Sequence, residues 1–183
     1  MPIHLSCRLH SFRYAGNLDE AIVGRRFQNQ DGLPLQREVY RVALNMILAV
    51  KALHDNYRCV HGDIKPANFL GKLEHQSGAA SADGQYALWR LADFGLTGPP
   101  DAATGILNGS LGTPAHSAPE VLEQHGSTFA SDRYSLAVSL WELLNLRCRT
   151  CAPEPARNHT YSTYGSCVTH ALWLISDLQT HGM

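Results

Sequence analysis

One apolar stripe between positions 35 and 57 constrains the fold more than any other feature of the sequence. Its members recur at steps of three and four residues: Val39, Val42, Met46, Val50 and Leu53. This spacing places all five side chains on one face of a helix, where they can pack against a core. We therefore expect a long amphipathic helix from Leu35 to Tyr57.

The rest of the chain adds strands and further helices. Phe69–Leu70 and Tyr86–Leu91 predict two strands, joined by a Ser-, Ala- and Gly-rich connection from Gln76 to Gly84. Arg133–Leu146 is apolar on almost every side, which predicts a central, buried helix. Val168–Leu178 has apolar residues at helical spacing and predicts one more amphipathic helix. The expected fold class is α+β, mostly helical with a short β-hairpin.

Length and composition indicate one folded domain. The 183 residues, 44% of them hydrophobic and 17% charged, suffice to bury a core. A net charge of −1 gives no general attraction to nucleic acid or to anionic membranes. We find no apolar run of membrane-spanning length and no secretory signal, so we expect a cytoplasmic or nuclear location.

The cysteines do not indicate a disulfide framework. There are five of them at scattered positions, an odd number that favours reduced thiols. A zinc site built from Cys148, Cys151, His159 and Cys167 is the weaker alternative, because a second closely spaced pair is missing.

Residues 61–68 hold the first cluster of reactive side chains, in the order His-Gly-Asp-Ile-Lys-Pro-Ala-Asn. Asp63 and Asn68 place a carboxylate and an amide on one short turn, with the Lys65 cation between them. Pro66 stiffens that turn by fixing its backbone angle. Such a cluster suits a site that handles both a hydroxyl proton and a phosphate-bound metal.

A second carboxylate occurs in the sequence Asp93-Phe94-Gly95, thirty residues after Asp63. Because Asp93 follows an expected strand directly, it is well placed to bind a hard cation such as Mg²⁺, which prefers oxygen ligands. Gly95 lets the backbone turn sharply after it. The Gly- and Pro-rich residues 93–120 predict a long irregular segment, and such loops are usually functional in compact domains.

Taken together, these stretches resemble the protein kinase family. Residues 61–68 are similar to its catalytic loop, and residues 93–95 are similar to its D-F-G motif. Gly112–Glu120 resembles the end of the kinase activation segment, and Ser131–Leu143 resembles the central helix of the large lobe. Since all four blocks occur in the family's order, the joint match indicates common descent.

The resemblance implies three parts of the chain. Residues 1–34 would hold a hinge-like strand at Leu5–Tyr14 and the first helix of the C-terminal lobe at Asn17–Arg26, with Asp and Glu in its first turn. Residues 35–147 would form the kinase C-terminal lobe with catalytic loop and activation segment. Residues 148–183 would be a degenerate or truncated C-terminal part.

The resemblance also implies a role for each site residue. Asp63 would be catalytic and accept the proton of a Ser or Thr hydroxyl on a protein substrate. Asn68 and Asp93 would hold the Mg²⁺ that accompanies ATP, and Lys65 would contact the transferred phosphate. ATP and Mg²⁺ are therefore the implied cofactors. Lys65 together with Thr113 is similar to the Ser/Thr-directed pattern.

Supporting roles are implied for neighbouring residues. His61 would support the loop and Phe94, and Asp132 would cap the backbone amides of the catalytic loop. Leu53 and Leu70 are expected to pack and not to react.

Gly62 departs from the family, in which most members carry Arg at this position. That Arg pairs with a phosphorylated activation loop, which glycine cannot do. We therefore expect any activity to be independent of phosphorylation at Thr104 or Ser110. His116, where Tyr is common, is a milder departure.

The expected lobe architecture leaves several functions open. No Gly-rich loop occurs, and the lysines all lie at or after position 51, so we expect the N-terminal lobe to be largely absent. A partner protein would then cover the exposed N-lobe face. The readings that remain are a Ser/Thr kinase, a pseudokinase-like protein-binding module and a non-catalytic kinase fragment. The reactive residues favour the first, and the missing loop favours the other two.

Overall fold

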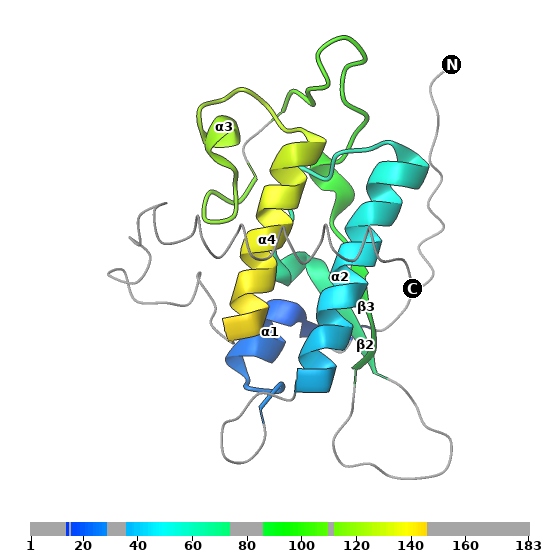
Figure 1. The fold of residues 1–183 in the computed structure, drawn as a ribbon, viewed down its shortest axis with the longest axis vertical. Helices are drawn as coiled ribbons and strands as arrows, with labels where there is room; N and C mark the ends of the chain where they lie inside the picture. The colour runs from blue at the N-terminus through cyan, green and yellow to red at the C-terminus, as the bar shows by residue number, and fades with distance from the viewer. Residues whose placement is uncertain (1–13, 15, 29–35, 74–85, 110–111, 146–183) are drawn as a thin grey trace.

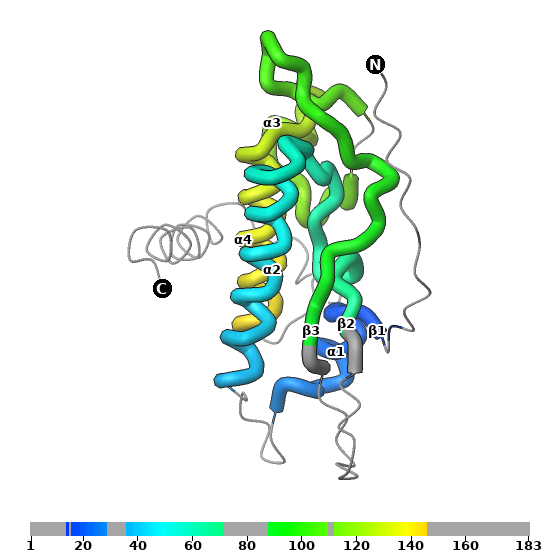
Figure 2. The backbone as a smooth tube through the Cα atoms, turned by 90° about the vertical axis from the view of Figure 1, so that its right-hand side faces the viewer, coloured from blue at the N-terminus to red at the C-terminus, as the bar shows by residue number. Residues whose placement is uncertain are grey.

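The computed structural model describes residues 14, 16–28, 36–73, 86–109 and 112–145 (Figure 1). Two long helices, α2 (Gln36–Tyr57) and α4 (Phe129–Asn145), lie side by side. Figure 2 shows both helices on one side of the ribbon formed by strands β2 and β3, and α2 contacts both α4 and β3. The α+β arrangement expected from the sequence is confirmed for these residues.

A small antiparallel sheet has the strand order β1-β2-β3, with β1 at Gly16–Asn17, β2 at Phe69–Leu73 and β3 at Tyr86–Leu91. Phe69 pairs with Leu91, so the β2–β3 hairpin predicted from the sequence is confirmed. Strand β1 was not predicted, because two residues cannot show an alternating pattern. The expected strand at residues 5–14 lies, apart from Tyr14, outside the described residues.

Helix α1 (Leu18–Val23) begins with a reciprocal cap. Asn17 Oδ1 accepts a hydrogen bond from Glu20 N at 2.9 Å, and Glu20 Oε2 accepts one from Asn17 N at 3.2 Å. This arrangement satisfies two amides that a helix start leaves without partners. The predicted helix is confirmed, but it ends at Val23 and not at Arg26, because Arg25 takes a left-handed backbone conformation with φ of 53°.

The predicted stripe on α2 forms one side of the core. Its five apolar members are all buried. Four of them, Val39, Val42, Met46 and Val50, pack in one cluster with residues of α1, the sheet and α4. The ring centroids of Phe27 and Trp89 lie 6.2 Å apart, and Trp89 N on β3 donates to Asn45 Oδ1 on α2 at 3.3 Å. The core therefore joins α2 to the hairpin that precedes Asp93.

Helix α4 is buried on most sides, as predicted, but it begins four residues before Arg133. Thr128 explains the early start, since its Oγ1 accepts from Ser131 N at 3.1 Å while Ser131 Oγ accepts from Thr128 N at 2.8 Å. Ser135 and Ser139 donate their hydroxyls to carbonyls one turn earlier, which satisfies these buried groups inside the helix.

Residues 93–109 and 112–120 are mainly irregular, as predicted, with the short helix η2 (Phe94–Leu96) and the start of α3 (Pro119–Leu122). Two backbone bridges hold the segment to the body, Val60 to Gly98 and Leu107 to Ser127. The predicted connection at 76–84, the helix at 168–178 and the cysteine set from 148 to 167 lie outside the described residues.

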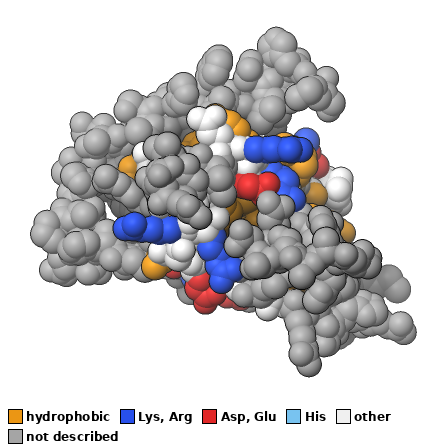
Figure 3. Space-filling model, turned by 90° about the horizontal axis from the view of Figure 1, so that it is seen from below, with side chains coloured by type: hydrophobic (Ala, Val, Ile, Leu, Met, Phe, Trp, Pro, Cys, Tyr) orange, Lys and Arg blue, Asp and Glu red, His pale blue; other side chains and the backbone are white. Residues whose placement is uncertain are grey.

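The surface carries mixed charge. Figure 3 shows the end of the molecule that lies lowest in Figure 1, where basic and acidic side chains lie beside one another. This agrees with the net charge of −1. Among the helices that the structure describes, none combines the length and hydropathy needed to cross a bilayer.

Candidate active site

His61 and Gly62, at the start of the predicted catalytic loop, are anchored on Asp132 of α4. The Asp132 carboxylate is buried and accepts hydrogen bonds from His61 N at 2.7 Å and Gly62 N at 3.0 Å. It also accepts from His54 Nε2 of α2 at 2.8 Å. The capping role expected for Asp132 is confirmed, and the loop is fixed to both long helices.

His61 joins this loop to the segment that carries Asp93. Its Nε2 donates to Ala92 O at 3.1 Å, and its Nδ1 accepts from Asp63 N at 3.3 Å. Its ring also packs edge-on against Phe94, with 5.4 Å between the ring centroids. Burial lowers the pKa of His61 and outweighs the opposing fields of Asp132, Asp63 and Asp93. His61 is therefore a neutral structural residue, as expected.

The Asp63 carboxylate is held by three donors. Its Oδ1 accepts from Thr113 N at 2.7 Å, and its Oδ2 accepts from Lys65 Nζ at 2.7 Å and from Asn68 Nδ2 at 3.3 Å. Burial alone would raise the pKa of Asp63, but the hydrogen bonds from Lys65 and Thr113 prevail and lower it. Asp63 is therefore a fixed, charged acceptor at neutral pH.

Lys65 and Asn68 are oriented by the same cluster. Lys65 Nζ also donates to Thr113 Oγ1 at 2.7 Å, which joins the turn at residues 61–68 to the irregular segment. The buried Asn68 donates Nδ2 to Asp63 O at 2.8 Å. Because Nδ2 is used in this way, Oδ1 is the atom of Asn68 that is suited to a metal.

Asp93 reaches the cluster through the hairpin. Ala92 N donates to Asn68 O at 2.9 Å, so the residue before Asp93 is bonded to the residue before β2. Asp93 is exposed and left-handed, with φ of 59°, a conformation that Asp tolerates better than most residues. The structure thus joins Asp63, Lys65 and Asn68 directly, and it ties the residue before Asp93 to Asn68 through one backbone hydrogen bond.

Two contributors to the site were not recognised in the sequence. His54 bonds Asp132, and its position next to the apolar Leu53 on one helix was the only available signal. Gly112 lies against Gly62 and Asp63, where an added Cβ would meet Gly62 O at 2.4 Å. Only glycine allows this approach, which sequence spacing does not reveal.

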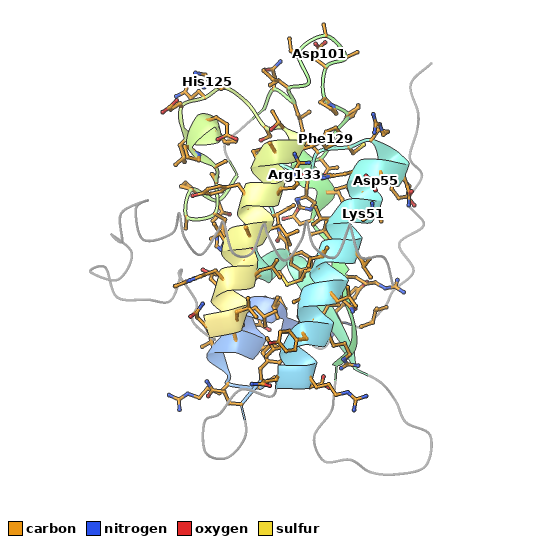
Figure 4. The ribbon with its side chains drawn as sticks, viewed as in Figure 1. Lys51, Asp55, Asp101, His125, Phe129 and Arg133 are labelled. Atoms are coloured by element: carbon orange, nitrogen blue, oxygen red, sulfur yellow. The ribbon has the colours of Figure 1, made fainter. Side chains whose placement is uncertain are left out.

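The outer part of the irregular segment is stabilised locally. Figure 4 shows Asp101 at its tip, at the same end of the molecule as Phe129. Asp101 Oδ1 accepts from Ala103 N at 3.0 Å, from Thr104 N at 2.9 Å and from Thr104 Oγ1 at 3.0 Å. These bonds lower the pKa of Asp101, the backbone bond from Thr104 most strongly.

Comparison with known proteins agrees with this geometry. Residues 14–170 match the protein kinase domain family. The chain is 30% identical over 129 residues to the MAP kinase kinase skh1/pek1 of Schizosaccharomyces pombe, which covers 70% of this chain and 31% of that protein. It is 34% identical over 110 residues to the serine/threonine-protein kinase PKZ1 of Phytophthora infestans, covering 57% of this chain and 27% of PKZ1.

A third relative is the dual specificity mitogen-activated protein kinase kinase mek-2 of Caenorhabditis elegans, 28% identical over 144 residues, with 79% of this chain and 33% of mek-2 covered. The matches thus span about a third of the length of these curated relatives. The family match covers most of the chain, including every residue of the site described above. This chain belongs to the protein kinase family.

Proposed function

We propose that this chain transfers the γ-phosphate of ATP to a Ser or Thr hydroxyl of a protein. The observation that carries the proposal is the Asp63 carboxylate, held charged between Lys65 and Thr113. A charged, fixed acceptor of this kind can orient a hydroxyl and take its proton. The serine/threonine and dual specificity kinases among the relatives support the same reaction class.

Each side chain has a distinct task in this reaction. Asp63 accepts the substrate proton, and Lys65 places its charge at the transferred phosphate while its bonds to Asp63 and Thr113 hold it in place. Phosphoryl transfer relies mainly on such positioning and on electrostatic stabilisation.

The metal ligands follow from the same geometry. When bound with ATP, Mg²⁺ neutralises the charge of the phosphates. Asn68 Oδ1 and the exposed Asp93 carboxylate present the oxygen ligands that this ion prefers. The backbone bond between Ala92 and Asn68 holds the two ligand residues at one end of the hairpin.

We also propose that residues 35–147 correspond to the helical C-terminal lobe of the family. The proposal rests on the order of catalytic loop, hairpin, irregular segment and α4 along the chain. Phe94 is 52% exposed and Leu96 is 37% exposed, beside the residues assigned to Mg²⁺. A small lobe or a partner protein would cover these apolar side chains.

A protein-binding module is the second candidate. The same exposed Phe94 and Leu96 favour it, because apolar side chains at a surface can dock a partner protein. This module would use the fold to present a surface and would not need the charge of Asp63.

Phosphate transfer to a Ser- and Thr-containing protein such as casein separates the two candidates. Under the kinase proposal, Asp63→Asn lowers the turnover of labelled ATP by at least about 100-fold, and thermal unfolding shows that the variant is folded. The matched control is Asp101→Asn, which removes a carboxylate charge away from the site and leaves turnover unchanged. Cooperative unfolding without any wild-type transfer would support the module and refute the kinase.

A further inference from the structure

We propose that His116 and Glu142 form a positioning pair that holds Thr113 against the Asp63 carboxylate. The effect of the pair on turnover rests on the proposed kinase function, whereas its effect on Thr113 does not. The pair connects α4 to the end of the irregular segment, whereas Asp132, in the first turn of the same helix, holds His61 and Gly62.

Both members of the pair are removed from solvent. The side chain of His116 is 3% exposed and that of Glu142 is 1% exposed, and His116 Nε2 lies 3.1 Å from Glu142 Oε2. A buried carboxylate needs strong donors, because burial disfavours its charge. The Nε2–H of His116 is such a donor, so the geometry requires His116 to face α4.

A short turn carries this constraint from His116 to Thr113. Thr113 O accepts hydrogen bonds from His116 N at 2.9 Å, Ser117 N at 3.1 Å and Ser117 Oγ at 3.0 Å. On its other side, Thr113 donates its N–H to Asp63 and accepts from Lys65. A displacement of His116 would therefore displace the residue that orients the catalytic carboxylate.

The environment of His116 Nδ1 supports a specific role for His116 Nε2. His116 Nδ1 is buried and has no hydrogen-bond partner among the residues that the structure describes. An unpaired buried polar atom costs free energy, and an apolar side chain of similar size would avoid that cost. The histidine therefore serves at this position through Nε2 and not as a filler of the core.

Helix α4 thus holds both halves of the site. Asp132 fixes the backbone of His61 and Gly62, and Glu142 fixes the turn that presents Thr113. Asp63 lies between these two anchors. The distance from Thr113 N to Asp63 Oδ1 then depends on the His116–Glu142 pair, because His116 is bonded to Thr113.

Amide hydrogen exchange of the full chain, followed by NMR, tests this inference without an activity assay. We expect His116→Leu to speed exchange of the Thr113 amide about tenfold relative to Met46 in the core of α2. His116→Gln keeps a donor of similar reach and should restore most of the protection. The surface control, His125→Leu, should leave Thr113 unchanged.

Unchanged Thr113 exchange in folded His116→Leu, or an equal rise at Thr113 and Met46, would overturn the pair as a positioning device. Should His116→Leu fail to fold, Glu142→Gln is measured instead, with the same localised rise expected. In the kinase assay, His116→Leu should lower kcat about tenfold and leave the KM for ATP unchanged. A chain without transfer activity would refute the proposed function, while hydrogen exchange would still decide on the pair.

Discussion

Two opposing effects act on the pKa of Asp63. Its burial raises the pKa, and the donors Lys65 and Thr113 lower it by more. A carboxyl group whose pKa is lowered by folding adds stability above its ordinary value of 3.8, and this stability is lost as the pH falls through the folded-state pKa. The hydrogen bonds to Asp63 therefore contribute to the acid sensitivity of the fold.

Lys65→Met should raise the pKa of Asp63, because the first of its lowering hydrogen bonds is lost. The acid-induced loss of stability below pH 3.8 should become correspondingly smaller. NMR titration of the Asp63 carboxyl carbon measures the shift. The matched control is Lys51→Met, which should raise only the pKa of Asp55, its own hydrogen-bond partner. An unchanged Asp63 pKa in Lys65→Met would contradict the electrostatic account.

Gly62 shows what sequence comparison at a single position can miss. The absence of an Arg side chain predicts a change in regulation. The structure adds that the backbone conformation at position 62 favours glycine. Gly62 has φ of +81°, and a Cβ there would lie 3.3 Å from Leu96 O. Residues other than glycine are strained in this conformation.

We expect Gly62→Ala to lower the free energy of unfolding by about 1–3 kcal/mol. Gly109→Ala is the control, because a Cβ at Gly109 has nothing within 4 Å. Urea unfolding of both variants compares the two costs. Equal stability of Gly62→Ala and Gly109→Ala would show that the left-handed turn at Gly62 is not required.

Among the elements, the helices were more predictable than the irregular segment. The stripe on α2 repeats over many turns, so its pattern fixed the burial of Val39, Met46 and Val50 in advance. The N-terminus of α4 was missed because its signal is a pair of hydroxyl caps at Thr128 and Ser131, with no periodicity. Contacts such as His116 with Glu142 join distant positions and leave no local pattern.

The Asp101 turn gives the expected independence of phosphorylation a structural basis. The Thr104 hydroxyl already donates to Asp101 and accepts from Ile106 N at 3.3 Å. A negative charge at Thr104 would lie beside the Asp101 carboxylate and repel it. Ser110, the other candidate position, lies outside the described residues.

Thr104→Glu should therefore leave the turnover of the kinase reaction within about twofold of wild type and loosen the turn at Asp101. Thr104→Val, which removes the hydroxyl without adding charge, is the control for the lost hydrogen bonds. Steady-state transfer assays on both variants measure the outcome. A several-fold rise in turnover for Thr104→Glu alone would refute independence of phosphorylation.

Across the whole molecule, the two motifs could be located from the sequence, and the family resemblance implied that they share one site, but the hydrogen bonds that join them could not be predicted. Spacing placed Asp63 and Asn68 on one turn, and the structure shows the hydrogen bonds that orient them. Asp93 comes next to that turn only because β2 and β3 pair and Ala92 bonds Asn68. The hairpin was predicted from its two strands, but the backbone bond from Ala92 to Asn68 depends on the tertiary fold, and no local pattern encodes it.

Paramagnetic broadening by Mn²⁺ with ATP tests whether the three residues share one metal–phosphate site, because Mn²⁺ can replace Mg²⁺ and relaxes only nearby nuclei. We expect the NMR signals of Asp63, Asn68 and Asp93 to broaden together, while that of the exposed Lys51 on α2 does not. Asp93→Asn should abolish the broadening of the Asp63 and Asn68 signals. Broadening at only one of the three, or equal broadening in Asp93→Asn, would contradict a shared metal–phosphate site.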